Sequence, residues 1–182
     1  MSQQEMLANV LPQFFPAHWL DSSDIVSSDF PSRIRIGYVI RSLHGYGYVN
    51  REELRALNVD LAGLHAAALT NLQALPSGNI RIAQHPEGPE GYITAEDNFA
   101  AVRILLPTAR RLLLSKLGPE FYAVIPHRDD CFCWSPKQST LRQAKHAQAA
   151  LEDFRSDEYQ LTPDILRVTE DGVSLYREQD AA

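Results

Sequence analysis

The stretch that most constrains the fold runs from residue 98 to residue 134, because it joins the densest apolar sequence to the main polar cluster of the chain. Apolar residues recur at steps of three and four as far as Leu117, as they do on the buried face of a helix. Gly118-Pro119 then supplies a helix stop. The run 121–126 is continuously apolar, which indicates a strand buried on both faces. Residues 131–134 are predicted to form a second strand that returns alongside the first. We expect these elements to form the centre of the fold.

Pro107 interrupts the predicted helix, whose start we place near Glu96 or Asp97 because acidic residues suit the positive end of a helix. Proline lacks a backbone N–H and clashes with the carbonyl of Arg103, which costs about 3 kcal/mol in a straight helix. The sequence therefore predicts either a kink at Pro107 or two helices, with Pro107 in the first turn of the second.

Elsewhere the sequence alternates between strand pairs and helices. Strand pairs are predicted at 33–41 with 43–49, 80–83 with 92–94, 121–126 with 131–134, and 164–169 with 173–176. Further helices are predicted at 50–57, 60–75 and 139–154, the last with Leu141, Ala144, Ala147, Leu151 and Phe154 facing inward. This order indicates an α+β fold with an antiparallel or mixed sheet, built from ββα units with helices packed mainly on one face.

The first 31 residues are predicted to form an N-terminal helical arm, with residues 32–182 as a single α+β domain. The arm would hold one helix over 3–15, followed by an irregular Ser- and Asp-rich segment. Its aromatic residues Phe14, Phe15 and Trp19 are expected to be covered, either by the domain itself or by a partner subunit in a homo-oligomer.

Charge and composition exclude several functional classes. The net charge is −6, and only Lys116, Lys137 and Lys145 of the 17 basic residues are lysines, so non-specific binding to nucleic acid is not expected. A secretory or mitochondrial leader needs basic residues, and no lysine or arginine precedes Arg33. No apolar run approaches the ~20 residues needed to cross a membrane. These features predict a cytoplasmic protein without a membrane segment.

Four segments together are similar to a known family. These are LRALNVDLAGLHAAALTNLQALP at 54–76, DNFAAVRILLP at 97–107, VIPHRDD at 124–130 and LTPDILRV at 161–168. In their order and spacing, the chain resembles the DUF1444 family of bacterial proteins over about residues 38–176. The function of that family is unknown, so the resemblance implies no activity, and Cys131 and Cys133 do not match a family feature.

The turn from His127 to Asp130 is the main candidate for chemistry. His127-Arg128-Asp129 resembles the protein-kinase catalytic loop, but that motif needs an asparagine where this chain has Trp134, so a kinase is excluded. The turn could instead be a small acid–base site in which Asp129 orients His127. The alternative is a hairpin connection held by an ion pair, since an aspartate in a turn normally bonds its own backbone.

Cys131 and Cys133 are candidates for nucleophilic or metal chemistry. Both would project from the same face of a strand, and Cys131 could act as a nucleophile if another segment supplied a base. With His127, Asp129 and Asp130 they could also bind a metal, but two more ligands would have to converge from elsewhere, with His44 and His85 as possible donors. The single-residue spacing is not typical of zinc pairs. We therefore predict no metal and no cofactor.

An arginine group on the long helix, Arg103, Arg110 and Arg111, together with Arg128, could bind a carboxylate or phosphate, or could simply form a solvated helix face. No complete catalytic signature is present. The sequence therefore favours a non-catalytic cytoplasmic domain that binds a partner protein or a small ligand. The alternative is a small hydrolase-like enzyme that uses His127 with Asp129, or Cys131.

Overall fold

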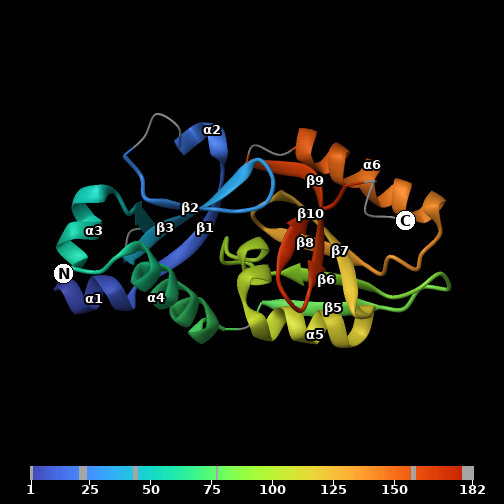
Figure 1. Ribbon diagram of the computed structural model, residues 1–182, viewed down its shortest axis with the longest axis horizontal. Helices are drawn as coiled ribbons and strands as arrows, with labels where there is room; N and C mark the ends of the chain where they lie inside the picture. Colours follow the sequence, from blue (N-terminus) through green and yellow to red (C-terminus); the bar gives the residue numbers. More distant parts are fainter. Residues whose placement is uncertain (1, 21–23, 43–44, 77, 157–158, 178–182) are drawn as a thin grey trace. The chain divides into compact units, whose positions relative to one another are not determined.

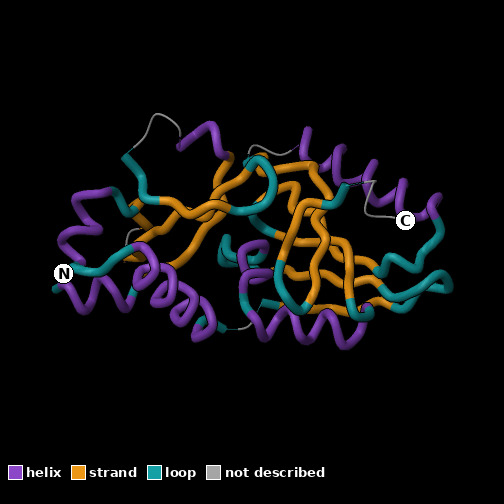
Figure 2. Tube along the Cα trace, in the orientation of Figure 1, coloured by secondary structure: helices purple, strands orange, loops and turns teal. Residues whose placement is uncertain are grey.

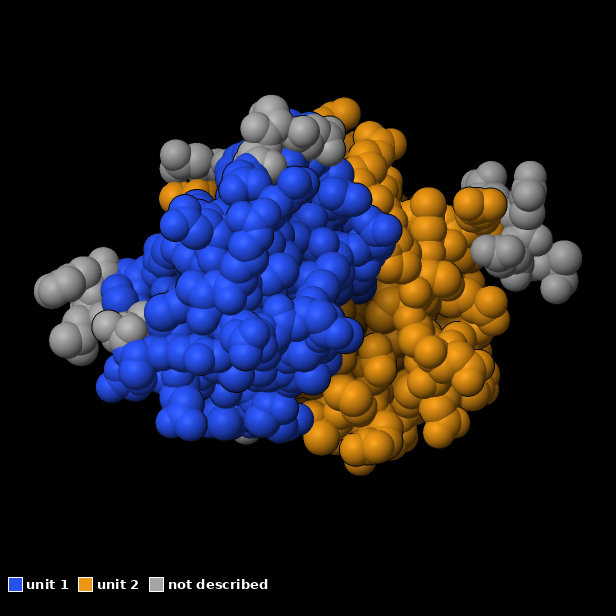
Figure 3. All heavy atoms as spheres, turned by 60° about the vertical axis from the view of Figure 1, so that its left-hand side comes forward, with its two compact units in different colours: residues 1–30, 34–77 blue, residues 31–33, 78–182 orange. Residues whose placement is uncertain are grey.

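The computed structural model describes all residues except 1, 21–23, 43–44, 77, 157–158 and 178–182. The chain packs as two compact units, one of residues 1–30 and 34–77 and the other of residues 31–33 and 78–182. Figure 3 distinguishes the two units by colour. They differ from the expected division into 1–31 and 32–182, because residues 34–77 pack with the N-terminal residues rather than with the rest of the chain.

Unit 1 is a small antiparallel sheet with helices packed against it (Figure 1). Its elements are α1 (Gln3–Ala8), β1 (Val10–Pro16), α2 (Ala17–Leu20), β2 (Ser27–Asp29), β3 (Ile34–Ser42), β4 (Gly45–Tyr48), α3 (Arg51–Leu57) and α4 (Leu61–Ala74). β3 pairs with β1 on one side and with β2 and β4 on the other. The helices predicted at 50–57 and 60–75 are both present: Asn50 forms a capping box with Glu53 at the start of α3, and Asp60 caps α4.

The expected helix over 3–15 is wrong beyond residue 8. Only Gln3–Ala8 is helical, and Val10–Pro16 forms β1. Pro12 would sit inside a helix, where it removes a hydrogen bond and clashes with the preceding turn. It is tolerated in β1 because β1 is an edge strand of its sheet. Phe14 and Phe15 are buried as expected, whereas Trp19 remains 48% exposed.

Unit 2 is built on a six-stranded antiparallel sheet with the strand order β10-β9-β7-β8-β6-β5. Its elements are β5 (Asn79–Ala83), β6 (Glu90–Thr94), the 3₁₀ helix η1 (Ala101–Leu105), α5 (Pro107–Leu117), β7 (Glu120–His127), β8 (Asp130–Trp134), α6 (Thr140–Ser156), β9 (Gln160–Thr169) and β10 (Val173–Leu175). The four predicted strand pairs all occur. The predicted α+β class with antiparallel sheets is confirmed.

The two long helices of unit 2 cover opposite faces of its sheet. Gly91 and Cys133 are register partners, and a Cβ on Gly91 would lie 2.8 Å from Leu113 Cδ2, so α5 packs on this face. Ala150 of α6 packs with Trp134, which points to the other face because side chains alternate along a strand. Figures 1 and 2 show the sheet between the two helices. The expectation of helices mainly on one face does not hold here.

The predicted break at Pro107 is present in its two-helix form. Pro107 occupies the first turn of α5. A backbone N–H at this position has no partner within the helix, so its absence in proline costs no hydrogen bond. The expected start near Glu96 or Asp97 is wrong, because the Asp97 carboxylate accepts the Phe99 N–H at 3.0 Å and holds that segment in a turn. The helical structure begins only at Ala101, as the buried 3₁₀ turn η1.

Helix α6 is rotated relative to the expected inward face. Leu141 is 69% exposed, and the buried residues of the helix are His146 and Ala150. Ala147, Leu151 and Phe154 are half-buried, whereas Ala144 is exposed. A histidine therefore occupies a position facing the sheet, which the apolar pattern alone did not indicate.

Candidate functional site

The His127–Asp130 segment is the β7–β8 hairpin connection that one of the two sequence interpretations predicted. His127 is not oriented by the Asp129 carboxylate. Instead, its Nδ1 accepts the Asp129 backbone N–H at 3.3 Å, and its Nε2 lies 3.5 Å from Asp130 Oδ1. The Asp129 carboxylate lies 3.9 Å from Arg128 Nε. Any acid–base role for this turn would therefore use the His127–Asp130 pair.

The two cysteine thiols lie side by side in the interior of unit 2. Cys131 and Cys133 are fully buried and free, with 3.7 Å between their Sγ atoms. The hydrogen bond to Cys133 and burial raise the pKa of the Cys131 thiol well above its ordinary value, and the Asp130 charge adds to this effect. A nucleophilic cysteine needs a lowered pKa and access to substrate, and this thiol has neither.

The arginines expected to form one group have separate environments. Arg103 is buried and donates to both Asp97 oxygens, at 3.0 and 2.6 Å, so it does not belong to a solvated helix face. Arg110 is half-buried, and burial lowers its pKa, while Arg111 is exposed. Arg128 places its guanidinium 3.7 Å from the centre of the Tyr159 ring. The structure does not gather these four side chains into a common anion site.

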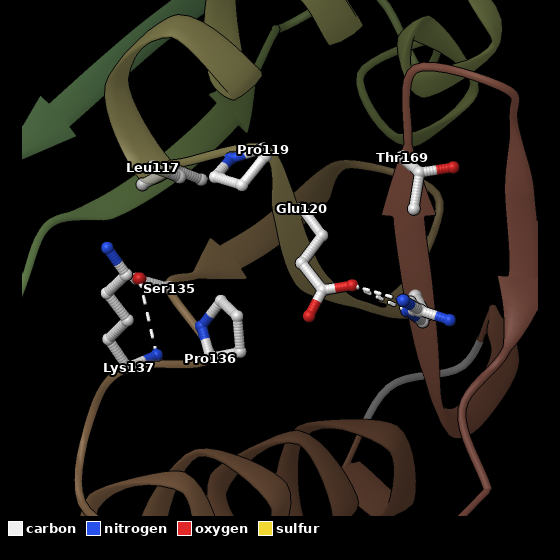
Figure 4. A pocket seen from close by; sticks show the side chains of 8 residues that line it. Leu117, Pro119, Glu120, Ser135, Pro136, Lys137 and Thr169 are labelled. Atoms are coloured by element: carbon white, nitrogen blue, oxygen red, sulfur yellow. Dashed lines mark hydrogen bonds and ion pairs between the residues drawn. The ribbon is translucent and has the colours of Figure 1, made fainter. Parts of the chain in front are cut away.

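A pocket of about 490 Å³ lies at one end of the unit 2 sheet (Figure 4). It is lined by Leu117, Pro119, Glu120, Ser135, Pro136, Lys137, Arg167 and Thr169. These residues come from the end of α5, the start of β7, the β8–α6 connection and the end of β9. Figure 4 shows Glu120 between Thr169 on one side and Ser135 and Lys137 on the other. The pocket volume falls in the range typical of small-ligand sites.

The pocket combines an ion pair, an ammonium group and an apolar wall. Arg167 contacts Glu120 Oε2 through Nε at 2.7 Å and through Nη2 at 2.5 Å. Among the residues that the structure describes, the Lys137 ammonium has no carboxylate partner. Ser135 Oγ accepts the Lys137 backbone N–H at 3.4 Å, so its hydroxyl proton can be donated elsewhere. The pocket therefore carries a net positive charge.

Sequence reasoning did not identify the lining residues of this pocket, because they are spread from 117 to 169. Glu120 and Thr169 become neighbours through the antiparallel register of β7 and β9, and Arg167 pairs with Tyr122 in the same ladder. The Gly118-Pro119 stop and the predicted strand pair of 164–169 with 173–176 indicated where these strands begin and end. The register that brings the strand ends together was not visible in a single sequence.

A buried polar network on the α6 face of the sheet was also missed. Glu90, which is 5% exposed, accepts from Arg142 Nη2 at 2.7 Å and from Gln138 Nε2 at 3.4 Å. His146 Nε2 lies 2.9 Å from Gln138 Oε1 and 3.3 Å from Glu90 Oε1. Because both neighbours are acceptors, the proton of the neutral imidazole belongs on Nε2. The network joins β6, the β8–α6 connection and α6.

Two partly or fully buried histidines make the stability of the protein depend on pH. Burial lowers the pKa of His65 in unit 1 and of His146 in unit 2, and at His146 it outweighs the attraction of Glu90. The unfolded chain, with histidine pKa values of about 6.5, then binds protons more readily than the folded chain. The stability that the two neutral imidazoles contribute is complete above that pH, and it decreases as the pH falls below it.

We expect the urea concentration at the midpoint of unfolding to decrease as the pH is lowered from about 7.5 to about 5.5. The carboxylates titrate below this pH window. His146→Gln and His65→Gln should each reduce this fall, measured by circular dichroism. His18→Gln provides the control, because His18 is exposed. An equal fall in all three variants and in the wild-type protein would show that the two buried histidines do not cause it.

His44 and His85 are the two histidines that the sequence offers as additional metal ligands. His85 Nδ1 accepts the Glu87 N–H at 3.2 Å, whereas His44 lies outside the described residues. Within the described parts of the chain, no group of three or more His, Cys, Asp or Glu residues could hold a metal ion. None of the helices in those parts is long and apolar enough to cross a membrane.

Comparison of the chain with protein-family models, with curated proteins and with solved structures finds no match. The candidate sites therefore rest on the geometry described above.

Proposed function

We propose that this protein is a non-catalytic cytoplasmic domain that binds a small organic anion in the unit 2 pocket. The observation that carries the proposal is the Lys137 ammonium, which has no carboxylate partner in the described structure and lies across the pocket from the Glu120–Arg167 pair, together with an apolar wall (Figure 4). A carboxylate or phosphate would form a charge-assisted hydrogen bond with Lys137. The apolar part of the ligand would lie against Leu117 and Pro136.

A hydroxyl group of the pocket supports the same ligand class. Ser135 lines the same side of the pocket as Lys137, and its hydroxyl can donate to an anionic oxygen. Glu120 is held by Arg167, which limits its repulsion of an incoming anion. Membership of the DUF1444 family stays a prediction.

The test uses three ligands of similar shape: benzoate, phenyl phosphate and the neutral benzamide. We expect the two anions to bind and benzamide to bind at least about tenfold more weakly, since a hydrogen bond to a charged group contributes about 1.5–3 kcal/mol. Lys137→Gln should weaken binding of the anions by a similar factor. Isothermal titration calorimetry measures both effects.

Lys145→Gln is the matched control, because it removes the same charge from an exposed position on α6 that does not line the pocket. Equal binding of benzamide and benzoate, or equal affinity in the Lys137→Gln and Lys145→Gln variants, would contradict the proposal. Circular dichroism of each variant establishes that the fold is retained.

A further inference from the structure

Unit 1 contains a second pocket, of about 620 Å³, which differs in character from the pocket of unit 2. It is lined by Leu20, Ile25, Val26, Ser27, Arg35, Arg51, Leu54, Arg55 and Leu61. The apolar members come from α2, the segment before β2, α3 and the start of α4. Leu20 and Val26 are buried and Leu61 is 38% exposed, so the apolar surface extends from the floor of the pocket to its rim.

Three arginines surround this apolar surface in a protein whose net charge is −6. Arg35 Nη2 lies 2.7 Å from Asp29 Oδ1, and the Asp29 side chain is 89% exposed. Arg51 Nε lies 3.4 Å from Asp24 Oδ1, in a pair that is exposed on both sides. Such surface pairs contribute only about 0–1 kcal/mol, so a competing carboxylate can replace either aspartate.

Arg55 has no carboxylate partner among the described residues. It lies one helical turn after Arg51, and both arginines, together with Leu54, line the pocket from α3. Four residues along a helix correspond to a rise of about 6 Å. This is close to the ~6.6 Å between alternate side chains of an extended peptide, which project to the same side. The two arginines therefore match two acidic side chains separated by one residue.

The lining residues also indicate which polymer does not fit. Single-stranded nucleic acid is bound by stacking its bases on aromatic side chains, and none of the described residues that line this pocket is aromatic. Its apolar residues are Leu, Ile and Val, which suit aliphatic or aromatic side chains of a peptide. Each of the three guanidinium groups can bind a carboxylate, so a ligand that matches the pocket carries several carboxylates rather than one.

From these observations we infer that the unit 1 pocket binds an acidic peptide segment of a partner protein, in which acidic residues alternate with apolar ones. The acidic side chains contact Arg35, Arg51 and Arg55, and an apolar side chain enters between them against Leu54 and Leu61. Binding weakens as the salt concentration rises, because the arginines are exposed to solvent. This site is independent of the anion pocket in unit 2.

The test uses a fluorescein-labelled random copolymer of glutamate and tyrosine, which samples many acidic–apolar sequences, and poly-glutamate of the same length. Fluorescence anisotropy with the full chain should show binding of the copolymer that is at least about tenfold tighter than binding of poly-glutamate. The double variant Arg51→Gln/Arg55→Gln should lose about tenfold or more in affinity for the copolymer. Replacing Asp29 with asparagine should increase the affinity, since it releases Arg35.

The matched control is the double variant Arg111→Gln/Arg155→Gln, which changes the net charge equally at exposed positions on α5 and α6. Equal weakening by both double variants would show that only the overall charge matters and would overturn the inference. Equal binding of poly-glutamate and the copolymer would overturn it as well, because the apolar floor would then play no part. Lys137→Gln should leave copolymer binding unchanged, which separates this result from the test of the unit 2 pocket.

Discussion

Replacing Asp97 with alanine is expected to lower the free energy of unfolding by about 3–5 kcal/mol, because it removes the carboxylate that faces a buried guanidinium. The Arg103 side chain is 4% exposed and lies 2.6 Å from Asp97 Oδ2. Burying a charge away from its counter-ion is far more costly than breaking an ion pair in water. Asp97 also accepts the Phe99 N–H, so the turn before η1 would lose this hydrogen bond as well. Urea unfolding followed by circular dichroism measures the loss.

Asp29→Ala is the matched control for this prediction. The Arg35–Asp29 pair has nearly the same length, 2.7 Å, but its aspartate is 89% exposed, so its loss should cost no more than about 1 kcal/mol. In the double variant Asp97→Ala/Arg103→Met the buried charge is gone, and part of the lost stability should return. If Asp97→Ala and Asp29→Ala destabilise the protein equally, burial of Arg103 is not what makes the first pair important.

Trp134→Ala is the second substitution with a large expected effect, about 3–5 kcal/mol, the usual cost of removing a large buried aromatic side chain. Trp134 is fully buried and packs at the centre of the α6 face, with Tyr122 at 6.0 Å, Phe132 at 5.5 Å and His146 at 5.1 Å between ring centres. Its removal would leave a cavity between the sheet and α6. Thermal or urea unfolding of the variant gives the measured loss.

Two further variants separate the contributions of Trp134. Its Nε1 has no hydrogen-bond partner within the described residues, and an unsatisfied buried N–H is itself unfavourable. Trp134→Phe should therefore cost much less than Trp134→Ala, because it removes that N–H while it retains an aromatic ring. Leu141→Ala, at a position 69% exposed on α6, should change stability by less than about 0.5 kcal/mol. A large loss in Leu141→Ala would show that α6 packs differently.

Features set by residues close together in sequence were predictable here. The helix at 50–57, the break at Pro107 and the hairpin of 164–169 with 173–176 each depend on residues close together in sequence, and all are present. The helical prediction for residues 10–15 failed because the apolar residues before Pro16 have helical spacing, whereas β1 is buried on both faces and needs no alternation. Pro12 was the local signal against a helix, but the pairing of β1 with β3, whose partner residues are 18 to 30 positions away in sequence, is what makes this segment a strand.

The candidate sites were less predictable, since they depend on register and on helix rotation. The unit 2 pocket forms where the ends of β7 and β9 meet the β8–α6 connection, and no local pattern joins Glu120 to Arg167. The Glu90 network joins residues about 50 positions apart, and the rotation of α6 that buries His146 depends on which face of the sheet the helix covers. Once the fold brings these residues together, the ion pairs and hydrogen bonds that they form follow from their residue types.

Strand β8 provides separate natural probes for the two layers of unit 2. Its cysteines project into the α5 layer and its tryptophan into the α6 layer, because side chains alternate along the strand. Thiol labelling of Cys131 and Cys133 therefore reports the opening of the α5 layer, and emission from Trp134 reports the loosening of the α6 layer. In a Trp19→Phe background the chain keeps only that one indole. The order in which the two sides of the sheet open can thus be followed without attaching any label to the folded protein in advance.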